Sequence, residues 1–188
     1  QNHCDPQWAA QFGHAAQLAK LPAAKVIRFE AVNAFNSFYP MELTATGQEV
    51  NELLQKNNGK DFLIFPEDRK YPIRMTSFLP YRWIRQGITN AFSGTAYRNE
   101  IYVYQLGVYA AFHDLQHIQL IFSDLVNDKG STIKAQSVHC FNLNGTDWLG
   151  KPFTKAISVR KGNIQALWIG IDIPLSAEPG YYQGHVTV

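Results

Sequence analysis

The chain has 188 residues and a net charge of +2; hydrophobic residues make up 46% of it and charged residues 17%. No run of basic residues is longer than two, so the sequence lacks the clustered positive charge that nucleic-acid binding requires. It also lacks the stretch of about 18 apolar residues that a membrane span needs. The length suits one domain with a core of its own, and the 13% aromatic content favours strands.

The first 24 residues differ in composition from the rest of the chain. Residues 6–21 are rich in Ala and Gln, and Pro22 closes this segment. The larger apolar side chains recur every three or four positions, at Trp8, Phe12, Ala15 and Leu18. This spacing predicts a short amphipathic helix. We therefore expect an N-terminal helical extension over residues 1–24 and a main domain over residues 25–188.

A second helix is predicted over residues 46–58. Thr46 can cap its N-terminus, and Glu49 three residues later completes the pattern of a capping box. One apolar face follows, formed by Val50, Leu53 and Leu54. Gly59 then stops the helix.

From residue 61 onward, short apolar runs alternate with turns. The predicted strands cover residues 61–65, 69–75, 100–111, 115–122, 131–142, 154–159, 165–173 and 181–188. Such spacing, without a helix between the strands, predicts a mainly β protein built as an antiparallel β-sandwich of jelly-roll or immunoglobulin-like type. The run at 100–111 is apolar on both faces, which is typical of an inner strand of a covered sheet.

The two ends of the chain and its two cysteines bear on the cellular location of the protein. The sequence begins at Gln1 without a leader, so we expect a mature protein that is secreted, periplasmic or on the cell surface. It ends within a strand pattern, which suggests a domain cut from a longer chain. Cys4 and Cys140 either form one disulfide or remain two separate thiols.

Two groups of acidic residues are candidate sites. Glu67 and Asp68 are adjacent and would point to opposite faces of a strand, so they would not flank one glycosidic bond. We expect them in a turn, paired with Arg69, Lys70 or Arg74. Four further acids lie near predicted strand ends, at Asp124, Asp128, Asp147 and Asp172. Carboxylate oxygens of this kind can bind a structural calcium ion, so such a site is one alternative, although no loop carries three acids at alternate positions. No other cofactor and no catalytic residue is expected.

Aromatic residues are the strongest candidates for binding. Trp83 and Trp148 are flanked by loop residues and are expected at the surface, together with Tyr97. Exposed rings can stack on a sugar or anchor a second domain. Trp168 lies in an almost fully apolar run and is expected in the core.

Four stretches of sequence together resemble a known family. They cover residues 30–42, residues 64–75, residues 100–109 with 122–125, and residues 140–148 with 179–188. In this order they are similar to the N-terminal sandwich domain of glycoside hydrolase family 123-like proteins of Bacteroidetes. The resemblance spans most of residues 25–188.

The resemblance implies a parent enzyme that removes terminal N-acetylgalactosamine by substrate assistance. Its Asp–Glu dyad belongs to a later catalytic barrel, and no position of this chain matches that dyad. The implied role is a non-catalytic accessory domain that packs on the C-terminal catalytic barrel of the same chain. The alternative is a carbohydrate-binding module that holds a glycan through exposed aromatics.

Overall fold

The computed structural model describes residues 39–188. The helix expected over residues 6–21 and the boundary expected near residue 25 therefore lie outside the described residues. Within the described part, no helix is long and apolar enough to cross a membrane.

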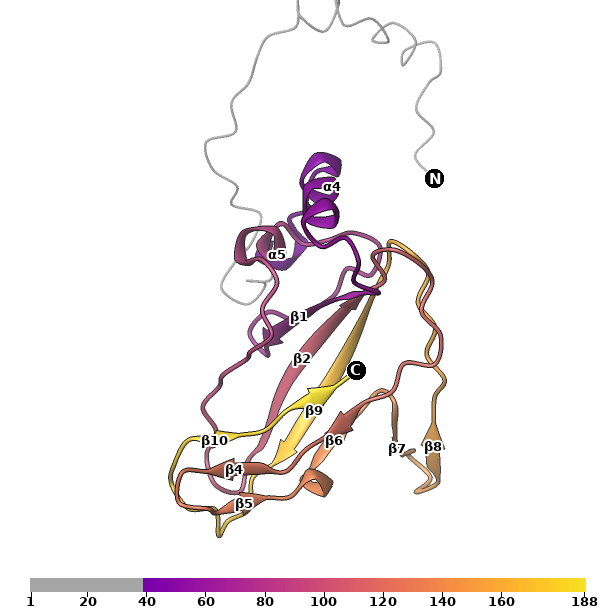
Figure 1. The fold of residues 1–188 in the computed structure, drawn as a ribbon. Coiled ribbons are helices and arrows are strands. Elements are labelled where there is room, and N and C mark those ends of the chain that lie inside the picture. The colour runs from indigo at the N-terminus through magenta and orange to yellow at the C-terminus, as the bar shows by residue number, and fades with distance from the viewer. Residues whose placement is uncertain (1–38) are drawn as a thin grey trace, which may run out of the picture. The chain divides into compact units, whose positions relative to one another are not determined.

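A four-stranded antiparallel sheet forms the centre of the fold (Figure 1). Its strands are β1 (Leu63–Asp68), β2 (Ile101–Tyr109), β9 (Ile164–Asp172) and β6 (Val138–Cys140), in that order across the sheet. Strands β2 and β9 pair along their full length. They are the two inner strands, in agreement with their two-sided apolar pattern.

The other strands are short and form three further antiparallel sheets. One sheet joins β10 (Tyr182–Gln183), β4 (Leu125–Asn127) and β5 (Thr132–Ile133), a second joins β11 (Val186–Thr187) and β3 (Ile121–Phe122), and a third joins β7 (Asn144–Thr146) and β8 (Pro152–Thr154). The prediction of a mainly β, antiparallel, sandwich-like fold is confirmed. The strands predicted over residues 115–122 and 181–188 are, however, mostly loops that carry short bridges.

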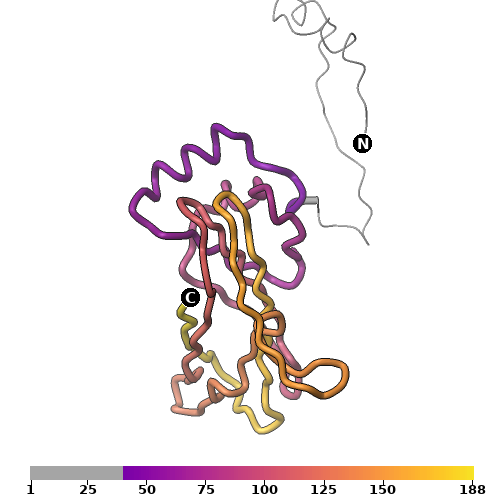
Figure 2. Tube along the Cα trace, turned by 90° about the vertical axis from the view of Figure 1, so that its right-hand side faces the viewer, coloured from indigo at the N-terminus to yellow at the C-terminus, as the bar shows by residue number. Residues whose placement is uncertain are grey.

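The α-helices of residues 39–188 gather at one end of the central sheet (Figures 1 and 2). They are α3 (Tyr39–Glu42), α4 (Gly47–Lys56) and α5 (Tyr81–Gln86); a 3-10 turn, η2 (Ala135–Ser137), precedes β6. Helix α4 begins with the predicted capping box. The Glu49 amide donates to Thr46 Oγ1 at 3.3 Å, and the Thr46 amide donates to Glu49 Oε2 at 2.8 Å.

Three predictions between residues 61 and 86 are wrong. The strand predicted over residues 61–65 does not end before Pro66, which lies inside β1; this is possible because β1 is an edge strand, where a missing N–H is tolerated. Residues 69–75 form a loop, in which the Ile73 amide donates to the side chain of Gln105 at 2.8 Å instead of to a strand. Helix α5 follows where the sequence was expected to hold no helix.

The central sheet separates two hydrophobic clusters. The helix-bearing face carries the first cluster, which includes Leu63, Phe65, Trp83, Tyr109 and Ile164. The strand-bearing face carries the second cluster, which includes Leu106, Val108, Leu167, Ile169 and the partly buried Phe122 and Val186 of β3 and β11. The short strands thus complete the sandwich by packing on one face, and the helices cover part of the other.

Trp83 connects α5 to the helix-bearing face. It is fully buried, and its ring stacks on Phe65 with centroids 4.5 Å apart and planes 2° apart. Gly107 lies beneath the indole: a Cβ at this position would stand 2.3 Å from Trp83 Cη2. The packing of the helices on the sheet therefore requires a residue without a side chain at position 107.

We expect Gly107→Ala to lower the free energy of unfolding by about 1–3 kcal/mol, because the added methyl group must displace the buried indole. Urea denaturation followed by circular dichroism measures this. Gly47→Ala is the matched control, since a Cβ there meets nothing within 4 Å and alanine suits a helix. Equal stability of Gly107→Ala and the parent chain would contradict the account.

Candidate functional site

The expectation that Trp83 lies at the surface is wrong. Its indole is 0% exposed, and its Nε1 donates to Glu67 Oε1 at 2.8 Å. Arg82 Nε donates to the same oxygen at 2.9 Å. The apolar body of the ring fills the first cluster while its N–H satisfies a buried carboxylate, so this tryptophan offers no face to a ligand.

The expected turn at Glu67 and Asp68 is also wrong, because both residues lie in β1. Glu67 is 2% exposed and faces Trp83, whereas Asp68 faces the other side and accepts from the Tyr102 hydroxyl at 3.2 Å. The expected basic partners bind elsewhere: Arg69 pairs with Glu100 and Arg74 with Glu42. The two carboxylates do not converge, as alternation along a strand predicts.

We expect Trp83→Phe to destabilise the domain by about 2–4 kcal/mol, because it leaves a cavity and removes a donor from the buried Glu67. Trp148→Phe serves as the control, and its unfolding free energy should stay within about 0.5 kcal/mol of the parent value. Urea midpoints of the two variants give the comparison. If Trp83→Phe left the free energy of unfolding unchanged, neither the indole N–H nor the volume of the indole ring would contribute to stability.

Trp148 lies at the exposed position expected from the sequence. It is 90% exposed, in the turn between β7 and β8, where Asp147 Oδ1 accepts from the amides of Leu149 and Lys151. Figure 2 shows this hairpin standing away from the sheets. A lone ring on a projecting turn can contact a ligand from one side only.

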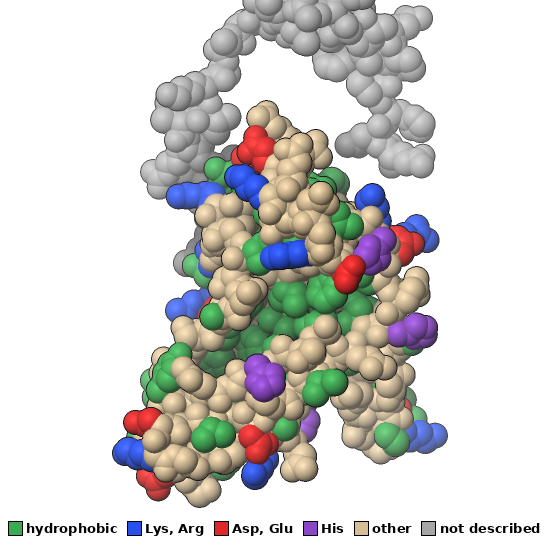
Figure 3. Space-filling model, viewed as in Figure 1, with side chains coloured by type: hydrophobic (Ala, Val, Ile, Leu, Met, Phe, Trp, Pro, Cys, Tyr) green, Lys and Arg blue, Asp and Glu red, His purple; other side chains and the backbone are tan. Residues whose placement is uncertain are grey.

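Tyr97 is 76% exposed and borders a groove of about 750 Å³ on the strand-bearing face. One wall of this groove is the loop over residues 90–98, and the other is the segment over residues 177–186. The floor comes from the central sheet and includes Tyr102, Tyr104 and Leu106. We call this groove the interlayer groove. Figure 3 looks onto the strand-bearing face and shows hydrophobic side chains in a hollow between the helices and the short strands.

Stacking holds the first wall of the interlayer groove against the sheet. The Phe92 ring lies on Tyr104 with centroids 5.0 Å apart and planes 12° apart. Gly94 packs directly against the Tyr102 hydroxyl, with no room for a side chain. Burial, with the nearby Cys140 thiol as a smaller cause, raises the pKa of Tyr104 to about 12. The groove floor therefore presents a neutral phenol.

This burial gives the domain a pH dependence at high pH. Between the ordinary tyrosine pKa near 10 and the raised value of Tyr104, the unfolded chain loses a phenol proton that the folded chain keeps. Stability should therefore be complete below pH 10 and fall by on the order of 2 kcal/mol as the pH rises to 12. Tyr104→Phe should reduce this fall, as measured by urea unfolding at several pH values. An identical pH profile for both proteins would contradict the assignment.

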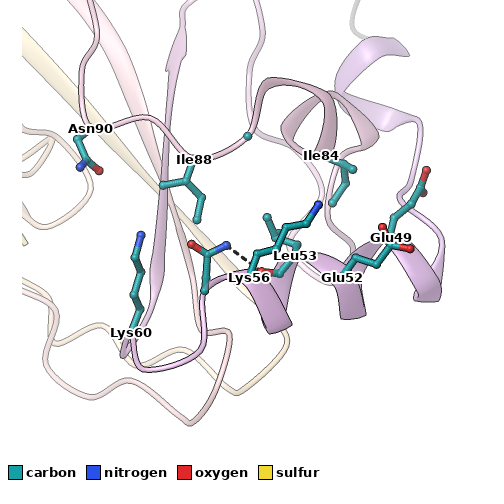
Figure 4. Close-up of a pocket in the computed structure, with 10 residues that line it drawn as sticks. Glu49, Glu52, Leu53, Lys56, Lys60, Ile84, Ile88 and Asn90 are labelled. Atoms are coloured by element: carbon teal, nitrogen blue, oxygen red, sulfur yellow. Dashed lines mark hydrogen bonds between the residues drawn. The ribbon is translucent and has the colours of Figure 1, made fainter.

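A second, smaller cavity of about 400 Å³ lies between α4 and the end of α5 (Figure 4). Its floor is apolar, formed by Leu53, Ile84 and Ile88. Figure 4 shows Glu49 and Glu52 at one end of the view and Lys60 at the other. Since Glu49 is engaged in the capping box, its carboxylate is committed to the helix terminus.

Of the four acidic residues that could bind calcium, Asp124 and Asp147 accept hydrogen bonds from protein donors. Asp124 accepts from Lys134 Nζ at 2.9 Å and from the Ala135 amide at 2.8 Å, and these bonds lower its pKa. Among residues 39–188, no group of three or more His, Cys, Asp or Glu side chains could hold a metal ion. Cys140 is a buried, free cysteine in this structure, and its Sγ lies 3.4 Å from Asn142 Oδ1. Cys4, with which it either forms a disulfide or remains a separate thiol in the sequence-based prediction, lies outside the described residues.

Trp168 is not in the core as expected but is 36% exposed on the helix-bearing face. The helices cover only one end of that face, and at the other end Ile101 and Phe141 are 54% and 46% exposed. The Phe141 ring covers Gly170, where a Cβ would also approach Ile101 at 3.3 Å. Together Ile101, Phe141 and Trp168 form what we call the open-face patch.

Among the comparisons with known proteins, a match was found by structure and not by sequence. No family model matches the chain, and no curated protein matches it either. A similar solved structure is a family 123 glycoside hydrolase from Clostridium perfringens, studied for the details of glycolipid glycan hydrolysis. The TM-score is 0.50 at 18% sequence identity. The match covers 68% of this chain and 24% of that enzyme, so this chain corresponds to about a quarter of its length.

At this identity the likeness establishes a shared fold. Sequence reasoning identified Tyr97 but not its partners in the interlayer groove, because Phe92, Tyr102 and Tyr104 meet the segment over residues 177–186 only in three dimensions.

Proposed function

We propose that this chain is a non-catalytic accessory β-sandwich domain of a secreted or periplasmic glycoside hydrolase, which packs on a catalytic barrel of the same polypeptide. The observation that carries this proposal is the coverage of the fold match, which takes in two thirds of this chain but a quarter of the family 123 enzyme. Most of that enzyme, therefore, lies beyond the part that resembles this domain.

The open-face patch is the surface proposed for contact with the barrel. It consists of Ile101 on β2, Trp168 on β9 and Phe141 directly after β6, and each side chain is at least one third exposed. Aromatic side chains are enriched in interface cores, where they bury a large area at low entropic cost. The helices already occupy the other end of the same face, so a neighbouring domain would complete its cover.

Ile101→Lys tests this contact. In the isolated 188-residue chain the side chain is 54% exposed, so the substitution should cost about 1 kcal/mol or less. In the longer polypeptide it should lower the melting temperature by several degrees, because a lysine would be buried against the barrel without a partner. Differential scanning calorimetry of both proteins provides the measurement.

Ile121→Lys is the matched control. Ile121 is 69% exposed, also lies on a strand, and belongs to the opposite layer, so its substitution should act alike in both proteins. The longer polypeptide is obtained by immunoprecipitation from source cells with an antibody against the 188-residue chain, and its coding sequence is then used for expression. Recovery of only a free 188-residue protein, without glycoside hydrolase activity in the precipitate, would refute the proposed role.

A further inference from the structure

We propose that the interlayer groove is a binding site for a neutral oligosaccharide, with Tyr97 and Tyr181 as stacking residues at its mouth. Both residues line the groove and are mostly exposed, 76% for Tyr97 and 66% for Tyr181. They come from opposite walls, one from the loop over residues 90–98 and one from the segment over residues 177–186. A ligand between these walls can therefore meet an aromatic side chain from either side.

The interior of the groove is suited to the apolar C–H face of a sugar ring. Phe92 and Tyr104 stack on each other, and Leu106, Ile133 and Val138 continue an apolar surface beside them. The volume of about 750 Å³ falls in the range of small-ligand sites.

Polar groups around the groove can bind hydroxyl groups. Within residues 39–188, the side chains of Asn90, Gln183 and His185 line it, are exposed and make no hydrogen bond. The amides of Asn90 and Gln183 each offer both donors and acceptors, which matches the mixed capacity of a sugar hydroxyl. The arrangement of apolar floor and polar rim is therefore complementary to an amphipathic ring.

The charge of the lining favours a neutral ligand. Among the side chains that border the groove, Arg98 and Glu178 are the two with a formal charge at neutral pH when histidine is neutral, and their charges are opposite. A site for a phosphorylated or strongly acidic ligand would show clustered Arg or Lys side chains. The lining carries no such excess.

A polypeptide strand is a less suitable occupant. Strand addition needs free backbone N–H and C=O groups along an edge strand. Most of the edge strands that line the groove are only two or three residues long, namely β3, β5, β6, β10 and β11, and the longer β1 carries Pro66, which has no N–H to donate. The interruption falls near the middle of β1, so a continuous ladder cannot form there.

Both walls are fixed before any ligand arrives. Tyr97 is held by its amide, which donates to Glu100 Oε2 at 2.8 Å, and Arg69 donates to the other oxygen of Glu100 at 2.6 Å. On the other wall, the Tyr182 hydroxyl donates to the Glu178 carbonyl at 3.0 Å and the His185 amide donates to Ser123 Oγ at 2.8 Å. Such preorganisation lowers the entropic cost of binding.

The test is calorimetric titration of the full 188-residue chain with chitotetraose, maltotetraose, cellotetraose and a neutral tetrasaccharide released from a glycolipid. We expect at least one of them to bind with a dissociation constant between about 10 μM and 1 mM. Tyr97→Ala and Tyr181→Ala should each weaken that binding about tenfold, because each removes one stacking ring. Circular dichroism should show both variants folded, since both side chains are mostly exposed.

Trp148→Ala is the matched control, because it removes an exposed aromatic ring outside the groove and should leave affinity unchanged. Three results would overturn the proposal: no saccharide bound at about 5 mM, binding insensitive to both tyrosine variants, or binding abolished by Trp148→Ala. Tyr181-dependent binding of an alternating Val–Thr decapeptide without saccharide binding would assign the groove to a peptide instead.

This proposal is independent of the accessory role. The groove lies on the strand-bearing face, whereas the open-face patch lies on the helix-bearing face. Loss of saccharide binding would leave the predicted effect of Ile101→Lys unchanged, and the two results can be told apart.

Discussion

The packing of Trp83 on the central sheet organises much of this domain. Its ring needs Phe65 as a flat partner, Gly107 as an open position beneath it and Glu67 as an acceptor. These three residues lie on neighbouring strands and face the same side, so the indole fixes α5 and the loop before it over one end of the sheet. The carboxylate of Glu67 is buried and would be costly without hydrogen-bond partners. The two donors from α5, Arg82 and Trp83, are therefore needed to offset its burial.

This arrangement leaves each face of the sheet only partly covered. On the helix-bearing face, the helices stop short of Ile101 and Trp168, and these side chains remain open to a neighbour. On the strand-bearing face, short strands cover the second cluster but leave a groove beside β1. A domain that completes its core with small elements thus gains two surfaces with different chemistry: a nearly flat apolar patch suited to another protein, and a concave aromatic groove suited to a small amphipathic ligand.

The sequence predicted the regular parts of this structure well. The two inner strands follow from runs that are apolar on both faces, and α4 follows from its capping box. The predicted burial of single side chains was wrong where contacts between distant parts of the chain determine it. Trp83 was expected at the surface because loop residues flank it, yet it is buried because the sheet provides Gly107 opposite it. Trp168 looked buried because its strand is apolar, yet no element covers its side of the sheet there. The groove could not be predicted, since its two walls, over residues 90–98 and 177–186, lie far apart in the sequence.

The pairing of β2 with β9 also sets the order in which the domain can assemble. Every strand from β3 to β8 lies in the connection between these two partners, so the central pair must form by closing a very long loop. Contacts of such high sequence separation slow folding, and the short strands of the second layer have nothing to pack on until the pair exists. Native-state hydrogen exchange should therefore show the backbone amides of β2 and β9 protected to the level of global unfolding, while β10 and β11 open first.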